Sequence, residues 1–274
     1  MEPLGPEDSE ALRTLLTRDI SHNLYLLGLW EEFGMAPRGE AQGAFYGRSV
    51  DGALSAALFV GGTGGLVVPS ASDGADVAEL SRALKGHFQL ESALGEKAAV
   101  DALLRAIAVR PRLCAEQRLF SVSADDLGPF TNPTLRLATA QDVPQLQALA
   151  RAAVEERLRA RFALEDVPLE ALAERVERRV KCGRTYVLSV EGRLVFKIDV
   201  GSRSQYGAEL EGLYTLPAER RMGHATLSLG QISRHLLSSL PRLTLRVDED
   251  NGSLARIAQK VGYVAKRSMR VVLA

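Results

Sequence analysis

Cysteine is scarce in this chain of 274 residues, which contains only Cys114 and Cys182. Two isolated cysteines provide neither the ligand spacing of a metal centre nor a disulfide framework, so we expect no metal site and a reducing compartment. The sequence also lacks an uninterrupted apolar run of the ~18–20 residues that a membrane helix needs. Its acidic N-terminus has no signal-peptide pattern. Together these absences predict a cytoplasmic protein that contacts no membrane.

Net charge is also absent, but the charges are unevenly distributed. Residues 1–133 contain 11 Lys and Arg against 18 Asp and Glu, whereas residues 134–274 contain 23 against 16. This asymmetry predicts two units, of which the basic one suits an anionic ligand such as a phosphate. The arginine-rich residues 151–184 are interspersed with glutamates, which favours solvated helices with i,i+4 ion pairs over nucleic-acid binding.

The strongest linker signal lies at residues 125–133, where two prolines, a glycine and several turn-forming residues follow one another. We therefore predict an N-terminal α/β lobe at residues 1–128 and a C-terminal domain at residues 134–274. Hydrophobic periodicity predicts the elements of both. In the first half we expect two short helices within residues 8–33, strands at 44–46, 53–60, 66–68 and 118–122, and helices at 75–87 and 98–108. In the second half we expect strands at 135–139, 185–190, 194–200, 208–216, 243–247 and 268–273, and helices at 143–161, 169–181, 225–240 and 253–261.

The order of these elements predicts an α+β fold with a mixed, mainly antiparallel sheet, a βαβ crossover and flanking helices. Both halves place helices before a run of strands, which hints at an internal duplication. The glycine-rich residues 61–65 lack the last glycine of a dinucleotide fingerprint and the Gly-Lys-Ser/Thr of a P-loop, so they predict a hairpin turn.

Residues 209–225, ELEGLYTLPAERRMGHA, are the segment most indicative of function. A predicted strand ends at Pro217, a short polar turn follows, and a helix begins near Gly223. The first turn of a helix presents unpaired N–H groups and the positive end of the helix dipole, so it suits a phosphate. Gly223 and Ala225 lack bulk and would let an anion approach the backbone closely. Gly230, inside the helix, predicts close packing against the sheet.

The pattern Arg220-x-x-Gly223-x-Ala225 resembles the signature of the GNAT superfamily of N-acetyltransferases. The resemblance implies that acetyl-CoA is the acyl donor. It implies that the strand before the loop binds the pantetheine arm through the backbone of Leu213 and Thr215. It also implies that the loop binds the CoA pyrophosphate through Arg220, Arg221, Met222, Gly223, His224 and Ala225.

Residues 247–251 and 257–263 resemble the next part of the same family pattern, a strand, an asparagine, and a helix that ends in Lys-x-Gly-Tyr. The resemblance implies that Asn251 contacts the CoA arm. Many relatives have, at position 258, a tyrosine that protonates the departing thiolate, but this chain has Ala258. The resemblance also extends, more loosely, to bacterial two-lobed members through residues 196–200 and 19–34, so we expect two GNAT-like lobes in tandem.

Glu209 and Glu211 are the candidate catalytic residues, because they lie two apart on the predicted acyl-carrying strand and so share a face. Glu211, nearer the expected reaction centre, would accept the proton of a primary amine. Tyr214 would face the opposite side unless the strand contains a bulge.

Three hypotheses follow. The first is an N-acetyltransferase that moves an acetyl group from acetyl-CoA to a primary amine of a small molecule or a peptide. The second is a non-catalytic acyl-CoA-binding or regulatory module, which Ala258 favours. The third is an aminoacyl transferase of the two-lobed type, against which the intact pyrophosphate loop argues. The sequence specifies neither the acceptor nor the oligomeric state.

Overall fold

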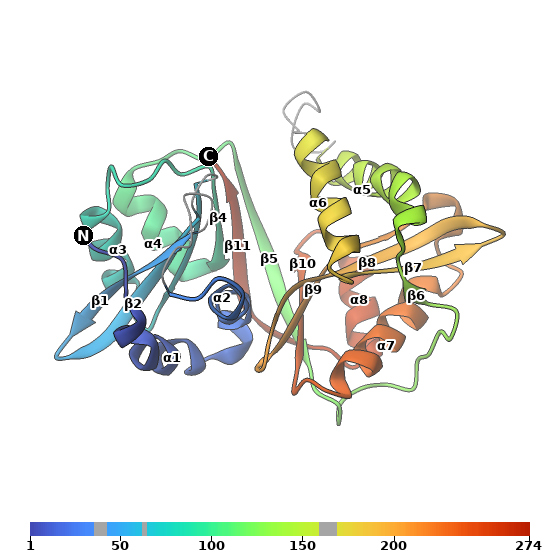
Figure 1. Cartoon of the computed structure of the whole chain (residues 1–274), viewed down its shortest axis with the longest axis horizontal. Coiled ribbons are helices and arrows are strands. Elements are labelled where there is room, and N and C mark those ends of the chain that lie inside the picture. Colours follow the sequence, from blue (N-terminus) through green and yellow to red (C-terminus); the bar gives the residue numbers. More distant parts are fainter. Residues whose placement is uncertain (36–42, 62–64, 159–168) are drawn as a thin grey trace.

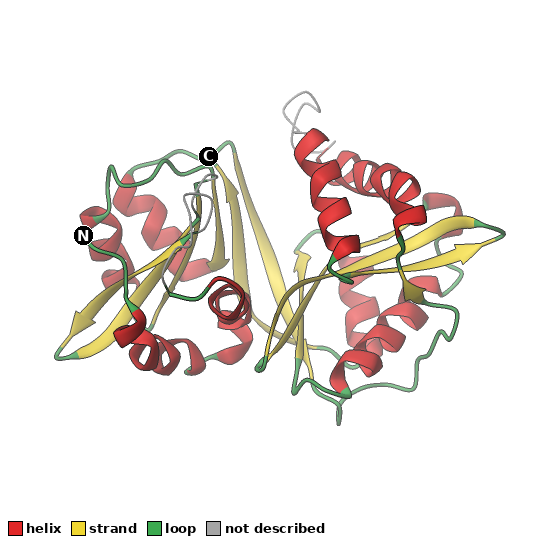
Figure 2. Cartoon of the chain, viewed as in Figure 1, coloured by secondary structure: helices red, strands yellow, loops and turns green. Residues whose placement is uncertain are grey.

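The structure, a computed structural model, describes residues 1–35, 43–61, 65–158 and 169–274. Within these ranges, 11 strands form one sheet in the order β1-β2-β3-β4-β11-β5-β10-β9-β8-β7-β6. The sheet runs through the whole molecule, and helices cover both of its faces (Figures 1 and 2). The predicted α+β class with a mainly antiparallel sheet is confirmed.

The N-terminal half consists of helices and strands that follow the predicted order with one addition. They are α1 Ser9–Thr17, α2 Ile20–Phe33, β1 Ala44–Val50, β2 Ala53–Val60, β3 Leu66–Ala71, α3 Gly74–Ala83, β4 Ser92–Glu96, α4 Lys97–Ile107 and β5 Leu113–Val122. The addition is β4, a five-residue strand. The sequence Ser-Ala-Leu-Gly-Glu gave no strand signal, because it is short and contains no β-branched residue.

The C-terminal half matches its predicted elements in number and order. They are β6 Arg136–Leu137, α5 Val143–Leu158, α6 Leu169–Lys181, β7 Thr185–Val190, β8 Arg193–Ser204, β9 Gly207–Thr215, α7 His224–Leu237, β10 Leu243–Asp248, α8 Gly252–Val261 and β11 Val264–Leu273. The last residues of the helix predicted at 143–161 lie outside the described residues, as does the centre of the turn predicted at 61–65. The strands on either side of that turn, β2 and β3, pair antiparallel.

The two halves repeat one order of elements, so the duplication that the sequence hinted at is present in the fold. Apart from the two-residue strand β6 that begins the second half, each half has two helices, three antiparallel strands, a helix, a strand parallel to the third one, another helix and a final strand. In the first half, α1 and α2 form one hydrophobic core with the strands, and α3 and α4 form a separate one. In the second half, α5 and α6 form one core with the strands, and α7 and α8 form the other.

The final strands of the two halves are exchanged. Strand β11, from the end of the chain, lies between β4 and β5, and β5 lies between β11 and β10 (Figure 1). The boundary predicted at residues 128–134 lies between β5 and β10 in the sequence. In the sheet, however, these two strands are direct neighbours. That boundary stays a prediction about folding units, since the sheet itself is continuous.

Helix α2 of the first half packs against β8 of the second half. The Ser202 hydroxyl donates to the carbonyl groups of Leu24 (3.4 Å) and Tyr25 (3.3 Å). At the end of the same helix, Glu31 accepts from the backbone N–H of Gln205 at 3.0 Å. These contacts hold an N-terminal helix over the face of the C-terminal strands. Among the described residues, no helix combines the length and the apolar character that a membrane span requires.

Gly230, in the middle of α7, makes a close contact with the linker and not with the sheet as we predicted. A Cβ at this position would lie 2.5 Å from the backbone oxygen of Phe130 and 2.6 Å from its Cβ. Glycine is needed at this position despite its low helix propensity, because the segment before β6 crosses α7 here and leaves no room for a Cβ.

We expect Gly230→Ala to lower the free energy of unfolding by about 1–2 kcal/mol, because the overlap with the Phe130 backbone exceeds the gain in helix propensity of about 1 kcal/mol. Gly252→Ala in α8 is the matched control, since its Cβ would meet only a flexible arginine nitrogen at 3.6 Å. Urea denaturation of both variants tests this. Equal stabilisation of the two would contradict a close approach at Gly230.

Candidate functional site

Strands β9 and β10 run side by side at one end and diverge at the other. They pair in parallel from Leu243 opposite Ala208 to Leu245 opposite Leu210, and the pairing then stops although both strands continue. On the side that faces the gap, divergence leaves backbone N–H and C=O groups of both strands without a neighbouring strand, while β9 still pairs with β8 and β10 with β5. Such a gap in a parallel pair is a place where an extended ligand can bond to the backbone.

A bulge in β9 lies next to this gap. The register with β8 passes from Glu211 opposite Asp199 to Tyr214 opposite Lys197, and it skips Gly212 and Leu213. Gly212 has φ = 61°, a left-handed conformation that favours glycine. The bulge turns Tyr214 onto the same face as Glu211. The sequence predicts Tyr214 on the opposite face unless the strand contains such a bulge.

Leu213, predicted to contact the CoA arm through its backbone, lies in the unpaired part of this bulge. Thr215, its predicted companion, is paired with Phe196 on β8. A backbone contact of Leu213 or Thr215 with the CoA arm stays a prediction.

The loop after β9 leads directly into the N-terminus of α7. Arg221 (φ = 66°) and Gly223 (φ = 86°) are both left-handed, and Gly223 occupies the N-cap position, where no side chain caps the helix. His224 and Ala225 lie in the first turn, and the Leu227 N–H donates to the Gly223 carbonyl at 3.0 Å. The preceding N–H groups have no carbonyl partner within a helix of this geometry. This end of α7 therefore presents free donors and a positive dipole.

The cationic residues of this loop have different environments. Arg220 donates to both oxygens of Glu156, at 2.8 and 2.6 Å, and to the Thr215 carbonyl at 3.0 Å. Its guanidinium also lies 5.5 Å from the centre of the Tyr214 ring. Arg220 thus fastens the loop to α5 and β9. Arg221 is exposed and has no ion-pair partner among the described residues.

The remaining predicted ligand residues lie around the same gap. Met222 is 62% exposed at the tip of the loop. Nε2 of His224 lies 3.8 Å from a Glu219 oxygen. Asn251 follows β10 and caps α8, since its side-chain oxygen accepts from the Leu254 N–H at 3.1 Å. A role for Asn251 in ligand binding stays a prediction.

The candidate catalytic carboxylates are both engaged with arginines. Glu209 and Glu211 lie on the same face of β9, as the alternation predicts, and the intervening Leu210 belongs to the opposite core. Glu209 is 3% exposed at its side chain and binds Arg246 of β10 at 2.5 Å. The Arg246 guanidinium carbon lies over the ring of Tyr25 of α2, 5.6 Å from the ring centre.

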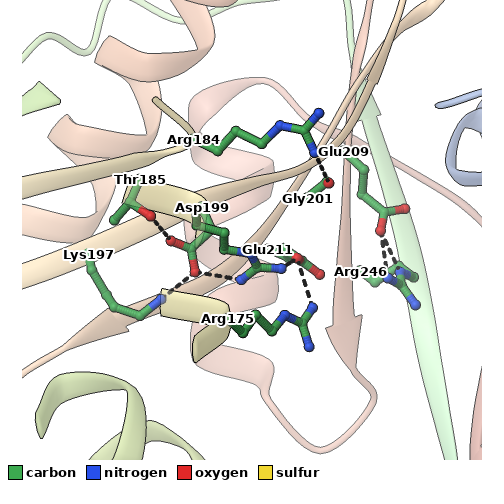
Figure 3. A network of polar contacts seen from close by, with 10 residues as sticks. Arg175, Arg184, Thr185, Lys197, Asp199, Gly201, Glu209, Glu211 and Arg246 are labelled. Carbon is green, nitrogen blue, oxygen red and sulfur yellow. Dashed lines mark hydrogen bonds and ion pairs between the residues drawn. The ribbon is translucent and has the colours of Figure 1, made fainter. Parts of the chain in front are cut away.

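A network of charged side chains surrounds Glu211 (Figure 3). Its Oε1 contacts Arg175 at 3.2 Å and also Arg179, both from α6. Its Oε2 has no partner among the described residues. Arg179 also forms an ion pair with Asp199 at 3.0 Å. Asp199 in turn binds the Lys197 ammonium at 2.5 Å and accepts a hydrogen bond from the Thr185 hydroxyl at 2.8 Å.

Burial and opposite charges act against each other in this network. Burial alone would raise the pKa of Asp199, but the neighbouring Lys197 and Arg179 charges lower it. Burial and then the like charge of Arg175 lower the pKa of Arg179 to about 10. Burial alone would lower the pKa of Arg246, but the Glu209 carboxylate raises it. Asp199 is therefore ionised at neutral pH, and its cationic neighbours hold it in place.

Most of this network could not be predicted from the sequence. Arg175 and Arg179 belong to the stretch that we interpreted as solvated, and for Arg179 this is wrong, since its side chain is only 17% exposed and reaches across to β8 and β9. The interpretation is correct for Arg151, which binds Glu155 one turn along α5 at 2.7 Å. The partner of a charged helix residue depends on which strand lies beneath it, and that is not a local property.

No family model matches the sequence, and no curated protein matches it. Solved structures do. An acetyltransferase of the GNAT family from Colwellia psychrerythraea is 12% identical, with 95% of this chain and 97% of that chain covered and a TM-score of 0.57. A Drosophila protein is 16% identical, with 100% and 98% covered and a TM-score of 0.71. A tandem GNAT protein from the clavulanic acid biosynthesis pathway is 13% identical, with 98% and 96% covered and a TM-score of 0.52.

The chain has a tandem GNAT fold. At these identities the likeness concerns the fold, and the roles of individual residues stay predictions. Within this tandem GNAT fold, Leu213 lies on β9 next to the gap between β9 and β10, and residues 220–225 lead from β9 into the start of α7, while their binding of CoA stays a prediction.

The phenol that the GNAT resemblance implies at position 258 has no close substitute in α8. Ala258 is fully buried. Tyr263 is also buried, its hydroxyl lies 2.7 Å from that of Ser233, and burial raises its pKa. Tyr214 is the phenol on the Glu211 face, and burial together with the Glu156 charge raises its pKa.

We expect Arg246→Met to lower the free energy of unfolding by about 3–5 kcal/mol, because it leaves the Glu209 carboxylate buried without its cation. Arg220→Met is the matched control. The Arg220–Glu156 pair is 39% and 50% exposed, so its loss should cost about 1 kcal/mol or less. Urea denaturation of both variants measures the difference, and equal losses would refute the structural role of the buried pair.

Proposed function

We propose that the C-terminal half binds acetyl-CoA and transfers its acetyl group to a primary amine. The observation that carries this proposal is the combination of a diverging parallel pair, β9 and β10, with an uncapped helix that begins immediately after β9. The gap suits an extended amide-containing chain, and the helix start suits a diphosphate. The tandem GNAT fold supports the same ligand.

In this arrangement the CoA pyrophosphate lies at the start of α7, where the N–H groups of Gly223, His224 and Ala225 face it and Arg221 adds an exposed positive charge. The pantetheine arm extends along β9 to the backbone of Leu213. Arg220 acts indirectly, because its contacts with Glu156 and Thr215 hold the loop in position.

The reacting groups would meet near Glu211. A neutral amine attacks the thioester carbonyl, a C–N bond forms, and the C–S bond breaks, so that CoA leaves as the thiolate with the electron pair of that bond. Glu211 accepts the amine proton at Oε2, while Arg175 and Arg179 hold Oε1. The tandem arrangement contributes α2, which lies over this face through Tyr25 and thereby forms part of the wall on the acceptor side. The acceptor is a small molecule or a peptide.

We expect acetyl-CoA and CoA to bind with similar affinity in calorimetric titrations, and pantetheine, which has no pyrophosphate, to bind much more weakly. Arg221→Gln should weaken CoA binding by up to about fivefold, because an ion pair between exposed charges contributes about 0.2–1 kcal/mol. Arg110→Gln, an exposed arginine in the N-terminal half, is the matched control. The proposal fails if neither CoA nor acetyl-CoA binds at millimolar concentration.

We expect Glu211→Gln to lower the rate of CoA release with an accepted amine by about 10²-fold or more, with little change in acetyl-CoA affinity, because the amide cannot accept the proton. Glu177→Gln on α6, which exchanges a carboxylate that binds only Gln147 among the described residues, is the control. Denaturation midpoints of both variants show whether the fold is retained. An unchanged rate in Glu211→Gln would exclude Glu211 as the base.

A second function, a non-catalytic acyl-CoA-binding module, is favoured by the buried Ala258 and by the two arginines on Glu211. It requires the same CoA affinity. The two functions differ in turnover, since the binding module releases no CoA above background from acetyl-CoA across a broad panel of amines.

A further inference from the structure

Arg175 of α6 is the most exposed charged residue in the network around Glu211 (Figure 3). Its side chain is 51% exposed, whereas those of Arg179 and Lys197 are 17% and 6% exposed. One terminal nitrogen of Arg175 donates to Oε1 of Glu211 at 3.2 Å, and the guanidinium has no other polar partner among the described residues. A guanidinium has several N–H donors in a planar fork, so most donors of Arg175 face solvent or a ligand.

The positive charge around Glu211 exceeds the negative charge. The connected network contains three cations and two carboxylates, namely Arg175, Arg179, Lys197, Glu211 and Asp199. The neighbouring pair of Arg246 and Glu209 is balanced by itself. Within the described part of the chain, the network therefore lacks one negative charge, and an anion from outside can reach it most easily at Arg175.

The excess charge is located where α6 presents two arginines one turn apart. Arg175 and Arg179 have the i,i+4 spacing at which like charges on a helix repel each other. Both guanidiniums contact the same oxygen, Oε1 of Glu211. Burial and then the charge of Arg175 lower the pKa of Arg179 to about 10, so the Glu211 and Asp199 carboxylates do not fully offset the repulsion. A further anion bound to Arg175 would offset it.

The atom that would accept the amine proton lies beside this arginine. Oε1 and Oε2 belong to one carboxylate, that of Glu211, and Oε2 has no partner among the described residues. The side chain of Glu211 is 21% exposed, so a ligand can contact it without displacing the core. A hydrogen-bond acceptor and a cation with free donors are therefore presented side by side.

Arg175 also lies within electrostatic reach of α2, the N-terminal helix that forms part of the proposed acceptor wall. Burial raises the pKa of the Tyr25 phenol on α2, and the charges of Arg246 and Arg175 are among those that lower it. A ligand held by Arg175 and Glu211 would thus lie on the acceptor side and not at the start of α7.

We propose that the acceptor is a free α-amino acid, whose amine donates to Oε2 of Glu211 while its carboxylate accepts from Arg175. In such a molecule a single carbon separates the two groups, as the adjacency of Oε2 and the guanidinium requires. Acetyl transfer then forms the C–N bond of an N-acetylamino acid and breaks the C–S bond, CoA leaves as the thiolate, and Glu211 takes the amine proton. The inference rests on the proposed acetyl transfer and specifies its acceptor.

The same charges disfavour other primary amines. A polyamine has a second cation near its amine, which Arg175 would repel. The N-terminus of a peptide has its nearest carboxyl group in a peptide bond and brings no charge to Arg175. A carboxylate carries one negative charge, which matches the single excess cation, whereas a phosphate monoester carries about two.

Pairs of an amino acid and its α-amide test the carboxylate contact in the intact chain. The members of a pair share their side chain and differ in the negative charge, and the less basic amine of the amide favours the amide. CoA release from acetyl-CoA is measured with glycine, the common L-amino acids, their α-amides, spermidine and an unblocked peptide. We expect the accepted amino acid to exceed its amide about fivefold or more in kcat/KM, because a bidentate contact of arginine with a carboxylate is stronger than an ordinary surface ion pair.

Arg175→Gln separates the carboxylate contact from the contact with Glu211. Its loss loosens Oε1 of Glu211 and slows both members of a pair alike, so only the ratio of acid to amide reports on the carboxylate. We expect this ratio to fall about fivefold or more in Arg175→Gln and to be partly retained in Arg175→Lys. Arg178→Gln, which changes an exposed arginine of the same helix, should leave the ratio unchanged. Denaturation midpoints show whether each variant is folded.

The outcomes distinguish this inference from the proposed function. If CoA is released but the amides, spermidine or the peptide are accepted as well as the acids, acetyl transfer stands and the amino-acid acceptor is overturned. The same holds if Arg175→Gln leaves the ratio unchanged. If no amine releases CoA, acetyl transfer fails, and calorimetric titration of the pairs with CoA present decides. Tighter binding of an acid than of its amide, lost in Arg175→Gln, supports the amino-acid site, and the absence of such a difference overturns it.

Discussion

The antiparallel pairing of β5 with β11 joins the two halves of the chain, because each strand extends the sheet formed by the other half. Its ladder runs from Leu273 opposite Leu113 to Val264 opposite Ser121. A continuous sheet fixes how the two sets of helices lie relative to one another (Figure 1). As a consequence, α2 is held over β8 and β9, where Tyr25 can reach the guanidinium of Arg246. The architecture of the candidate acceptor wall thus depends on backbone pairing elsewhere in the molecule.

The two halves share a topology but differ in the electrostatics of equivalent places. In each, a parallel pair diverges and a helix begins directly after the first strand of the pair. The start of α7 has a left-handed glycine and two arginines beside it, whereas the start of α3 has an aspartate cap and a second aspartate. Since the dipoles of the two helices are alike, the side chains decide whether an anion is attracted or repelled. The equivalent places of the two halves therefore differ in charge although they share a topology.

The two glutamates of β9 have different environments although they lie on one face. Glu209 is buried with a single arginine, and charges buried in this way are kept in a fixed geometry. Glu211 is partly exposed and has one oxygen bound to two arginines and the other available. An available oxygen next to a gap between strands is what a base requires, whereas full pairing is what a structural carboxylate requires. The bulge at Gly212 adds Tyr214 to the same face.

The sequence by itself determined the features that are local. The hydrophobic periodicity located nearly every helix and strand, and the strand, loop and helix at residues 209–225 are as predicted, because each depends on neighbours in the chain. Tertiary structure alone decided the exchange of β5 and β11, the approach of Phe130 to Gly230, and the partners of the β9 glutamates. Arg246 lies 37 residues from Glu209, and Arg267 lies 248 residues from Asp19. Such contacts depend on how the sheet assembles, and no local pattern of residues encodes them.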